Sequence, residues 1–298
     1  MNNILDYYYN LKKIDIININ NNYLIMDNND YSFLLYEVDK DVNLNNTIKL
    51  LGSLNNSNYS DLILNINRSY ITKIDEKYYV LIKLKGIINE VITLKDMVNN
   101  NIKYRINNYS LDLSKLWSRK IDYLEYQVSE LGNEYNEILD SFSFFIGLSE
   151  NAISFLNVNN INYNNTHKTI SHLRVKNNEL FLDYYNPLNI LIDYDIRDYA
   201  EYIKSKLLIT DNIDNDINYI LNNANLSIDD IKLFYARLMF PTLYFDKVEE
   251  ILIDKKDEKE LEVYIENIQR YINMLKDVYL EITKKGISID IPDWIIKN

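Results

Sequence analysis

The chain has 298 residues, of which 47% are hydrophobic and 26% charged, and its formal net charge is −12. This length and apolar content allow one large domain or two small ones with a real core, which argues against a disordered chain. The sequence contains no cysteine and only two histidines, so disulfides, thiolate zinc sites, cysteine nucleophiles and histidine-rich metal centres are excluded. The acidic balance argues against general nucleic-acid binding.

The N-terminal residues lack a basic stretch followed by an apolar one, so we expect no secretory signal. No run of sequence approaches the ~20 apolar residues that a membrane-spanning helix needs. We therefore expect a soluble protein that is synthesised in the cytoplasm and has no membrane span.

Residues 1–92 are predicted to form a β-rich lobe. Two apolar, aromatic-rich runs, 23–26 and 31–38, are separated by the polar cluster Asp-Asn-Asn-Asp, which is typical of a hairpin. Further along the lobe we expect one helix and two more strands, at 48–54, 61–67 and 78–84.

Residues 93–298 are predicted to form a mostly helical lobe. Apolar residues recur there at steps of three and four, which places them in a stripe on one face of a helix. The first stripe comprises Trp117, Ile121, Leu124, Val128, Leu131, Tyr135 and Ile138, and the second Leu261, Ile265, Ile268, Ile272, Leu275, Tyr279 and Ile282. Gly286 is expected to cap the second helix. We interpret both stripes as packing faces, with contact to a partner helix as the alternative.

An internal β-hairpin is predicted near residues 179–195, between the helices. Its two strands would cover 179–185 and 188–195, with Asn186-Pro187 at the turn. The chain would then consist of a lobe of strands followed by a larger lobe of helices that carries this one hairpin.

The stretch that begins at His172 resembles the catalytic loop of the aminoglycoside-phosphotransferase-like branch of the protein-kinase fold. In that branch the pattern is approximately His-Gly-Asp, then an Asn five residues after the Asp, then a strand, and later Ile-Asp-Phe. His172, the predicted strand from Leu180 and the pair Ile192-Asp193 match these landmarks in order. The resemblance implies an α+β, two-lobed, protein-kinase-like fold with a β-rich N-lobe (1–92) and a larger, mostly helical C-lobe (93–298).

Most of the groups that would carry out phosphoryl transfer are replaced. The chemistry needs an Asp to accept the proton of the attacking hydroxyl, an Asn and a second Asp for magnesium, and a Lys and a flexible loop for the phosphates. Arg174 stands at the base position and cannot accept a proton. Glu179 stands at the Asn position, with Asn178 one place away, and Asp193 is the second Asp. Losing a general base alone costs ~10²–10⁴ in rate.

The groups that would hold the nucleotide phosphates are also missing. The predicted third strand, 31–38, contains no Lys, and no glycine precedes it. We therefore assign no cofactor, and ATP and Mg²⁺ would be bound only if the chain were an active phosphotransferase. Glu179 and Asp193 are the possible magnesium ligands, and for Asp193 a turn-capping role is the equal alternative.

The resemblance assigns two further residues to the scaffold of the loop. In the resembled fold, the loop His and an Asp that opens the next helix hold the loop through backbone hydrogen bonds. His172 and Asp198 occupy those positions. Retained scaffold residues beside replaced reacting ones are what a pseudokinase would show.

A closer resemblance comes from five segments in fixed order, at 116–122, 147–153, 193–203, 236–245 and 291–294. Together these segments resemble the YutH and CotS-related spore coat proteins of endospore-forming bacteria. The resemblance implies a kinase-like fold, deposition on or near the spore coat, and other coat proteins as partners.

The sequence therefore favours a kinase-like pseudoenzyme that acts as a structural or interaction component of the bacterial spore coat. The alternative is an active ATP-dependent phosphotransferase for a small molecule, similar to aminoglycoside or choline kinases. It would use Asp193 and Glu179 for magnesium and a base that the sequence does not reveal. A nucleotide-binding switch without turnover lies between the two.

Overall fold

The computed structural model describes residues 1–12, 14–19, 21–27, 30–54, 57–86, 89–106 and 111–297. The chain divides into two compact units. Unit 1 consists of Met1–Ile92 together with Asn178–Leu191, and unit 2 of Thr93–Asn177 together with Ile192–Asn298. Residues Asn178–Leu191, which we had assigned to the helical lobe, thus group with Met1–Ile92 in unit 1.

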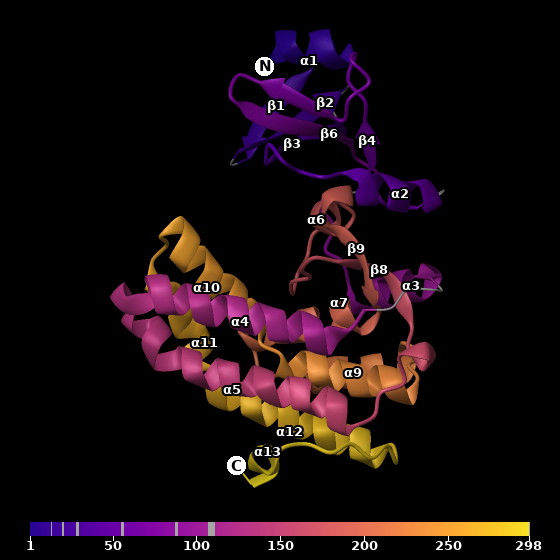
Figure 1. The fold of residues 1–298 in the computed structure, drawn as a ribbon. Coiled ribbons are helices and arrows are strands. Elements are labelled where there is room, and N and C mark those ends of the chain that lie inside the picture. Colours follow the sequence, from indigo (N-terminus) through magenta and orange to yellow (C-terminus); the bar gives the residue numbers. More distant parts are fainter. Residues whose placement is uncertain are drawn as a thin grey trace. The chain divides into compact units, whose positions relative to one another are not determined.

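Unit 1 is built on an antiparallel sheet (Figure 1). Its strands β1 (Asp15–Ile19), β2 (Asn22–Asp27), β3 (Asp30–Val38), β6 (Lys77–Lys83) and β4 (Asp61–Ile63) lie in this spatial order, and β5 (Ile71–Ile74) also pairs with β6. Alternate residues face opposite sides of a sheet. Accordingly, Leu34 and Leu35 of β3 belong to separate apolar clusters. The predicted hairpin is confirmed as β2 and β3, whereas strand β1 was not predicted.

Short helices close the two faces of this sheet. Helix α1 (Asn2–Tyr9), which was not predicted, contributes Leu5 to one cluster. Helix α2 (Asn45–Ser53), which confirms the helix expected near 48–54, places Ile48 on the other. Leu182 and Leu188 pack against that same cluster. The returning segment therefore supplies part of the core of unit 1.

The first strand of the predicted internal hairpin is wrong, because residues Phe181–Tyr184 form the short helix α6. A short apolar run cannot be assigned to strand or helix from periodicity alone. After it, Asn186 accepts a hydrogen bond from the backbone N–H of Leu188 at 3.0 Å and begins a 3-10 turn, Pro187–Asn189. The second predicted strand is present as β9 (Ile190–Tyr194).

Gly86, which follows strand β6, leaves room for the ring of Phe181 in the returning segment, residues 178–191. Gly86 has a φ of +78°, and a Cβ built on it would lie 2.5 Å from Cζ of Phe181. Only glycine adopts this conformation without strain and leaves room for the ring.

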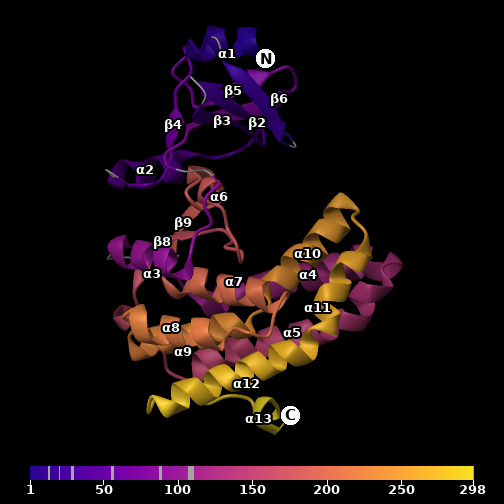
Figure 2. The same cartoon turned by 180° about the vertical axis from the view of Figure 1, so that it is seen from behind.

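Unit 2 combines a small sheet with a bundle of helices (Figures 1 and 2). The sheet has the order β7 (Arg105–Ile106), β8 (Lys168–His172) and β9. The helices are α3 (Leu94–Lys103), α4 (Leu113–Leu131), α5 (Asn136–Val158), α7 (Ile196–Leu207), α8 (Asp214–Asn223), α9 (Ile228–Met239), α10 (Thr242–Asp254), α11 (Glu262–Glu266), α12 (Ile268–Lys284) and α13 (Asp293–Lys297). Helix α9 contacts α5, α7 and α12. Its residues from Leu233 to Met239 are all buried, as expected for a central helix.

Both predicted stripes are divided between two helices. In the first, Trp117 and Val128 are buried on α4, but α4 ends at Leu131, and a 3-10 turn, Gly132–Glu134, precedes α5. In the second, α11 precedes α12. Gly286 follows the C-cap residue of α12 with a φ of +76°, in the left-handed conformation expected there.

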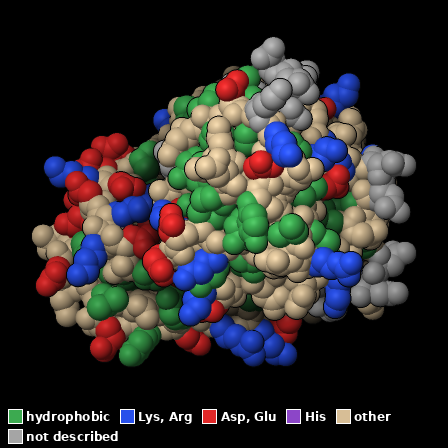
Figure 3. Space-filling view, turned by 90° about the horizontal axis from the view of Figure 1, so that it is seen from above, with side chains coloured by type: hydrophobic (Ala, Val, Ile, Leu, Met, Phe, Trp, Pro, Cys, Tyr) green, Lys and Arg blue, Asp and Glu red, His purple; other side chains and the backbone are tan. Residues whose placement is uncertain are grey.

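The helices and the surface were compared with the expectations for membrane crossing and for charge. Within the described ranges, no helix has both the length and the apolar character needed to cross a bilayer. On the face that Figure 3 shows, Lys, Arg, Asp and Glu side chains are scattered among hydrophobic and uncharged ones.

Candidate functional site around the loop after strand β8

The candidate site collects side chains from four elements of unit 2. Strand β8 ends at His172, and Arg174 lies in the loop that follows it. Strand β9 carries Asp193, and α7 begins at Ile196 and carries Asp198 in its first turn. Helix α10 adds Asp246, which the sequence analysis did not identify.

His172 and Asp198 are in direct contact. The backbone N–H of His172 donates to Oδ1 of Asp198 at 3.0 Å, and Nδ1 of His172 lies 2.8 Å from Oδ2. Both residues are buried, so the two interactions are shielded from water. This is the arrangement expected of residues that hold the loop, and their assignment to the scaffold stays a prediction.

Arg174 places a guanidinium, paired with a carboxylate of helix α10, where phosphoryl transfer would need a free carboxylate. Its Nε and Nη2 donate to the two oxygens of Asp246, the second at 2.7 Å, and Nη1 donates to the backbone oxygen of Leu173 at 2.6 Å. Burial opposes the charge on Arg174, but the hydrogen bond with Asp246 and the negative charges of Glu201, Asp246 and Glu249 together outweigh it, so the pKa of Arg174 is raised above its ordinary value. The guanidinium stays charged and has no lone pair for a proton.

Asp193 is surrounded by cations. Its Oδ2 accepts hydrogen bonds from Arg197 at 2.7 Å and from Arg237 at 2.5 Å, and its Oδ1 accepts one from the backbone N–H of Tyr194 at 2.7 Å. Burial by itself disfavours ionisation of Asp193, but the two guanidiniums outweigh this and lower the pKa of the carboxyl. The carboxylate is thus ionised and already compensated within the chain.

Arg197 links the loop to Asp193. Besides its bond to Asp193, it donates from Nε to the backbone oxygen of His172 and from Nη2 to that of Leu173, both at 2.8 Å. A single side chain therefore fixes the backbone of the loop relative to strand β9. Sequence analysis missed this role, although the spacing of four residues between Asp193 and Arg197 was visible. Arg237, 44 residues from Asp193, and Asp246, 72 residues from Arg174, gave no local signal.

A buried ion pair lies on the next turn of α7. Lys204 donates to Oε1 of Glu201 at 3.1 Å, and the hydroxyl of Thr242 donates to the same oxygen at 2.8 Å. Burial opposes ionisation of Glu201, but the charges of Lys204 and Arg174 outweigh it and lower its pKa to about 2. Burial also lowers the pKa of Lys204 to about 8, against the attraction of Glu201. Both groups are therefore charged near pH 7.

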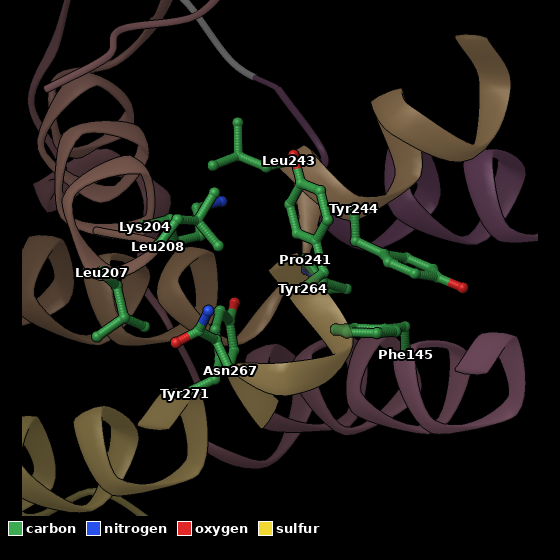
Figure 4. A pocket seen from close by; sticks show the side chains of 10 residues that line it. All are labelled: Phe145, Lys204, Leu207, Leu208, Pro241, Leu243, Tyr244, Tyr264, Asn267 and Tyr271. Carbon is green, nitrogen blue, oxygen red and sulfur yellow. The ribbon is translucent and has the colours of Figure 1, made fainter. Parts of the chain in front are cut away.

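Lys204 borders a small cavity in unit 2 that is lined mainly by aromatic and aliphatic side chains (Figure 4). Phe145 and Tyr244 stack there with ring centroids 3.7 Å apart, and Tyr264 and Tyr271 also line it. Its free space of about 20 Å³ is enough for one or two waters. It is too small for a nucleotide.

The residues near Asp193 do not fit a magnesium–nucleotide site. Magnesium needs anionic or neutral oxygen ligands in nearly octahedral geometry, whereas two guanidiniums occupy Oδ2 of Asp193. The other predicted ligand, Glu179, belongs to unit 1, where its backbone oxygen accepts a hydrogen bond from Ile92 at 2.8 Å. Elsewhere in the described ranges, no group of three or more His, Asp or Glu side chains is arranged to hold a metal.

Comparison with known proteins identifies the family. A family model described as the spore coat putative kinase YutH matches residues 2–282. The chain belongs to this family. The endospore coat-associated protein YutH of Bacillus subtilis (strain 168) is 26% identical over 208 residues, and the matched region spans 61% of each chain. The predicted membership of the YutH family is therefore confirmed.

Solved structures confirm the predicted α+β, kinase-like fold. A microcompartment-associated aminopropanol kinase is similar with a TM-score of 0.58 and 9% identity, covering 97% of this chain and 98% of that one. An aminoglycoside phosphotransferase from Alicyclobacillus acidocaldarius has a TM-score of 0.52, 10% identity and coverage of 91% and 92%. Spectinomycin phosphotransferase in its AMP-bound form has a TM-score of 0.51, 11% identity and coverage of 93% and 96%. At these identities the likeness establishes the fold alone.

Proposed function

We propose that this member of the YutH family is a kinase-like pseudoenzyme that serves as a structural or interaction component of the spore coat. The observation that carries the proposal is the ion pair between Arg174 and Asp246. A phosphotransferase of this fold needs a proton-accepting carboxylate at the position of Arg174. Asp246, the acid beside that position, is engaged through both of its oxygens.

The environment of Asp193 supports the same proposal. A magnesium ion there would have to approach a carboxylate that two arginines already neutralise, and like charges repel strongly where water is excluded. The loop scaffold made by His172, Asp198 and Arg197 is meanwhile complete. The chain thus keeps the groups that shape the loop and lacks those that would react.

A role in the coat is supported by the family and by the name of the Bacillus subtilis relative, an endospore coat-associated protein. We propose that this chain is likewise deposited on the coat and that its partners are other coat proteins. In this role the surface of the kinase-like fold, instead of a reaction centre, would carry the function.

Thermal unfolding with ATP and magnesium tests the proposal, because a ligand that binds only the folded state must raise the midpoint. The parent and the Asp193→Asn variant are compared with ATP–Mg²⁺ at millimolar concentration and with Mg²⁺ alone, and phosphate release and transfer are measured in parallel. We expect the midpoint of the parent to change by less than about 1 °C on adding ATP–Mg²⁺, with no turnover. The Asp193→Asn variant should unfold at a lower temperature, because the buried Arg237 and the partly buried Arg197 lose their counter-charge.

Two other results would contradict the proposal. A rise in the midpoint that Asp193→Asn abolishes, accompanied by phosphate transfer, would show an active phosphotransferase. The same rise without transfer would indicate a nucleotide-binding switch.

A further inference from the structure

An apolar groove runs along the surface between α4 and α5, apart from the candidate site. Leu139, Phe142 and Ile146 of α5 recur at steps of three and four and line it together with Val128 of α4. Such spacing places the α5 residues on one face of the helix. Val128 and Ile146 are buried in the floor of the groove, whereas Leu139 at its edge is 48% exposed.

A glycine in the middle of α5 deepens the groove. Gly147 lies on the lining, and a Cβ built on it would meet no atom within 4 Å. Glycine inside a helix costs about 1 kcal/mol relative to alanine, and packing within the described part of this chain gives no reason for it. The absent side chain instead leaves a hollow that an external side chain can fill.

The two walls of the groove each carry an acid. Glu125 comes from α4 and Glu150 from α5. Both are exposed, and within the described ranges neither carboxylate forms an ion pair or a side-chain hydrogen bond. An apolar floor between two uncompensated carboxylates is complementary to an apolar side chain flanked by basic ones.

We propose that this groove binds an amphipathic helix of a partner protein, with the apolar stripe of that helix seated over Gly147 and its lysines or arginines facing Glu125 and Glu150. Laying the apolar face of a helix into an apolar groove is a common recognition mode. A second copy of this chain fits poorly, because each copy has a net charge of −12 and acids on the groove walls. The inference rests on the proposed interaction role and names the kind of partner that the role requires.

A model peptide tests the groove directly. The probe is a fluorescein-labelled peptide of leucine and lysine in amphipathic order, roughly 18 residues long so that it can form a helix. A second peptide, with glutamate in place of lysine, is the control. Fluorescence anisotropy with the full chain measures both affinities at low and at physiological ionic strength. We expect the lysine peptide to bind and the glutamate peptide not to bind.

Substitutions at Gly147 separate the groove from the rest of the surface. The indole of Gly147→Trp would occupy the hollow, so we expect the peptide to bind at least about tenfold more weakly. Gly147→Ala adds a Cβ that meets no atom of the chain within 4 Å, so it should weaken binding less than Gly147→Trp does and should unfold at a slightly higher temperature than the parent. Equal affinity for the Trp variant and the parent would overturn the proposal.

A matched pair of charge variants separates local from general attraction. Glu125→Gln/Glu150→Gln and Glu262→Gln/Asp290→Asn each remove two negative charges from exposed positions of unit 2. We expect the first pair to weaken binding about 3- to 10-fold at low salt and the second to change it less than about twofold. Equal losses from both pairs, or no binding by the parent, would overturn the proposal.

The remaining outcomes are also decisive. If sedimentation shows a dimer that Gly147→Trp dissociates, the occupant is a second copy and the partner proposal is wrong. Phosphate transfer by the parent would overturn the pseudoenzyme proposal while leaving the peptide result intact. Loss of the peptide result would overturn the groove alone.

Discussion

At the scale of single residues, Asp198 holds the loop after strand β8 in place through His172. It is fully buried, and both of its oxygens face His172, at 3.0 Å from the backbone nitrogen and 2.8 Å from Nδ1. Asp198→Ala leaves a buried backbone N–H without an acceptor, which costs ~1–3 kcal/mol. We expect a corresponding fall in the free energy of unfolding, measured with urea. Asp140→Ala, at an exposed position of α5, should change it by less than about 0.5 kcal/mol. If the two variants unfold alike, the loop does not depend on Asp198.

Glu201 makes the stability of the fold depend on pH in the acidic range. Because its pKa in the folded chain is about 2 and its ordinary value is 4.5, the unfolded chain binds the proton more readily between these pH values. The stabilising contribution of Glu201 is therefore complete above about pH 4.5 and is lost as the pH falls toward 2. Its full size is on the order of 3 kcal/mol, since one unit of pKa corresponds to about 1.4 kcal/mol.

The Glu201→Gln variant tests this contribution. Urea unfolding at pH 6 and at pH 3.5 should show a smaller loss of stability on acidification for the variant than for the parent. Glu262→Gln, at an exposed position, should keep the dependence of the parent. An undiminished loss in Glu201→Gln would mean that other carboxylates account for the acid sensitivity.

The start of helix α9 shows how one cap can serve two segments. Asp230 completes a capping box with Ser227, whose backbone N–H donates to Oδ2 at 2.9 Å. Oδ1 of Asp230 also accepts a hydrogen bond from the backbone N–H of His167 at 2.8 Å, and Asp230 is fully buried. The capping box of α3, formed by Thr93 and Asp96, is exposed and holds its own helix. Loss of Asp230 should therefore cost more than loss of Asp96.

Alanine variants of the two caps provide the comparison. We expect Asp96→Ala to lower the free energy of unfolding by about 1 kcal/mol, because the exposed backbone N–H of Thr93 loses one hydrogen bond of the capping box. Asp230→Ala should lower it by about 2–3 kcal/mol, because the amide of His167 also loses its acceptor. Equal costs in urea unfolding would show that the contact with His167 adds nothing.

Periodicity and turn chemistry predicted the elements whose reasons are local. The stripe through Trp117 and Val128 is buried on α4 as expected, and the β2–β3 hairpin follows its polar turn. The stripe continued past Leu131 in sequence, but a 3-10 turn interrupts the helix there. Hydrophobic spacing does not detect such a turn, because the apolar positions on the two sides stay in register.

The candidate site was predictable only in part, for the same reason. Arg174, Asp193 and Asp198 were found because a family pattern fixes their spacing along the chain. The sequence did not reveal that Arg237 neutralises Asp193, because Arg237 lies on α9 and tertiary packing brings the two together. Pairing between distant charges leaves no periodic trace in a sequence.

At the scale of the whole molecule, the division into units departs from chain order. Residues Asn178–Leu191 belong to unit 1 although unit 2 precedes and follows them. Ile92 donates its backbone N–H to Glu179 at 2.8 Å, and Phe181 donates to Glu90 at 2.8 Å. Tyr59 and Tyr185 also meet edge to face, with ring centroids 5.2 Å apart. These contacts make the returning segment a structural part of the β-rich unit.

Removing the apolar contacts of this segment should therefore weaken unit 1 selectively. Leu182→Ala/Leu188→Ala deletes side chains that are partly buried against the cluster of Leu34 and Ile82, at a cost of about 1–3 kcal/mol for the pair. Hydrogen exchange on the full chain should then be faster in β3 and β6 while protection in α9 is kept, since local units open separately. Leu64→Ala, whose side chain is 46% exposed, serves as the matched control and should leave both regions protected. If hydrogen exchange became equally faster in β6 and α9, the chain would open as a single cooperative body. If exchange became faster in α9 alone, the segment would stabilise unit 2 instead of unit 1.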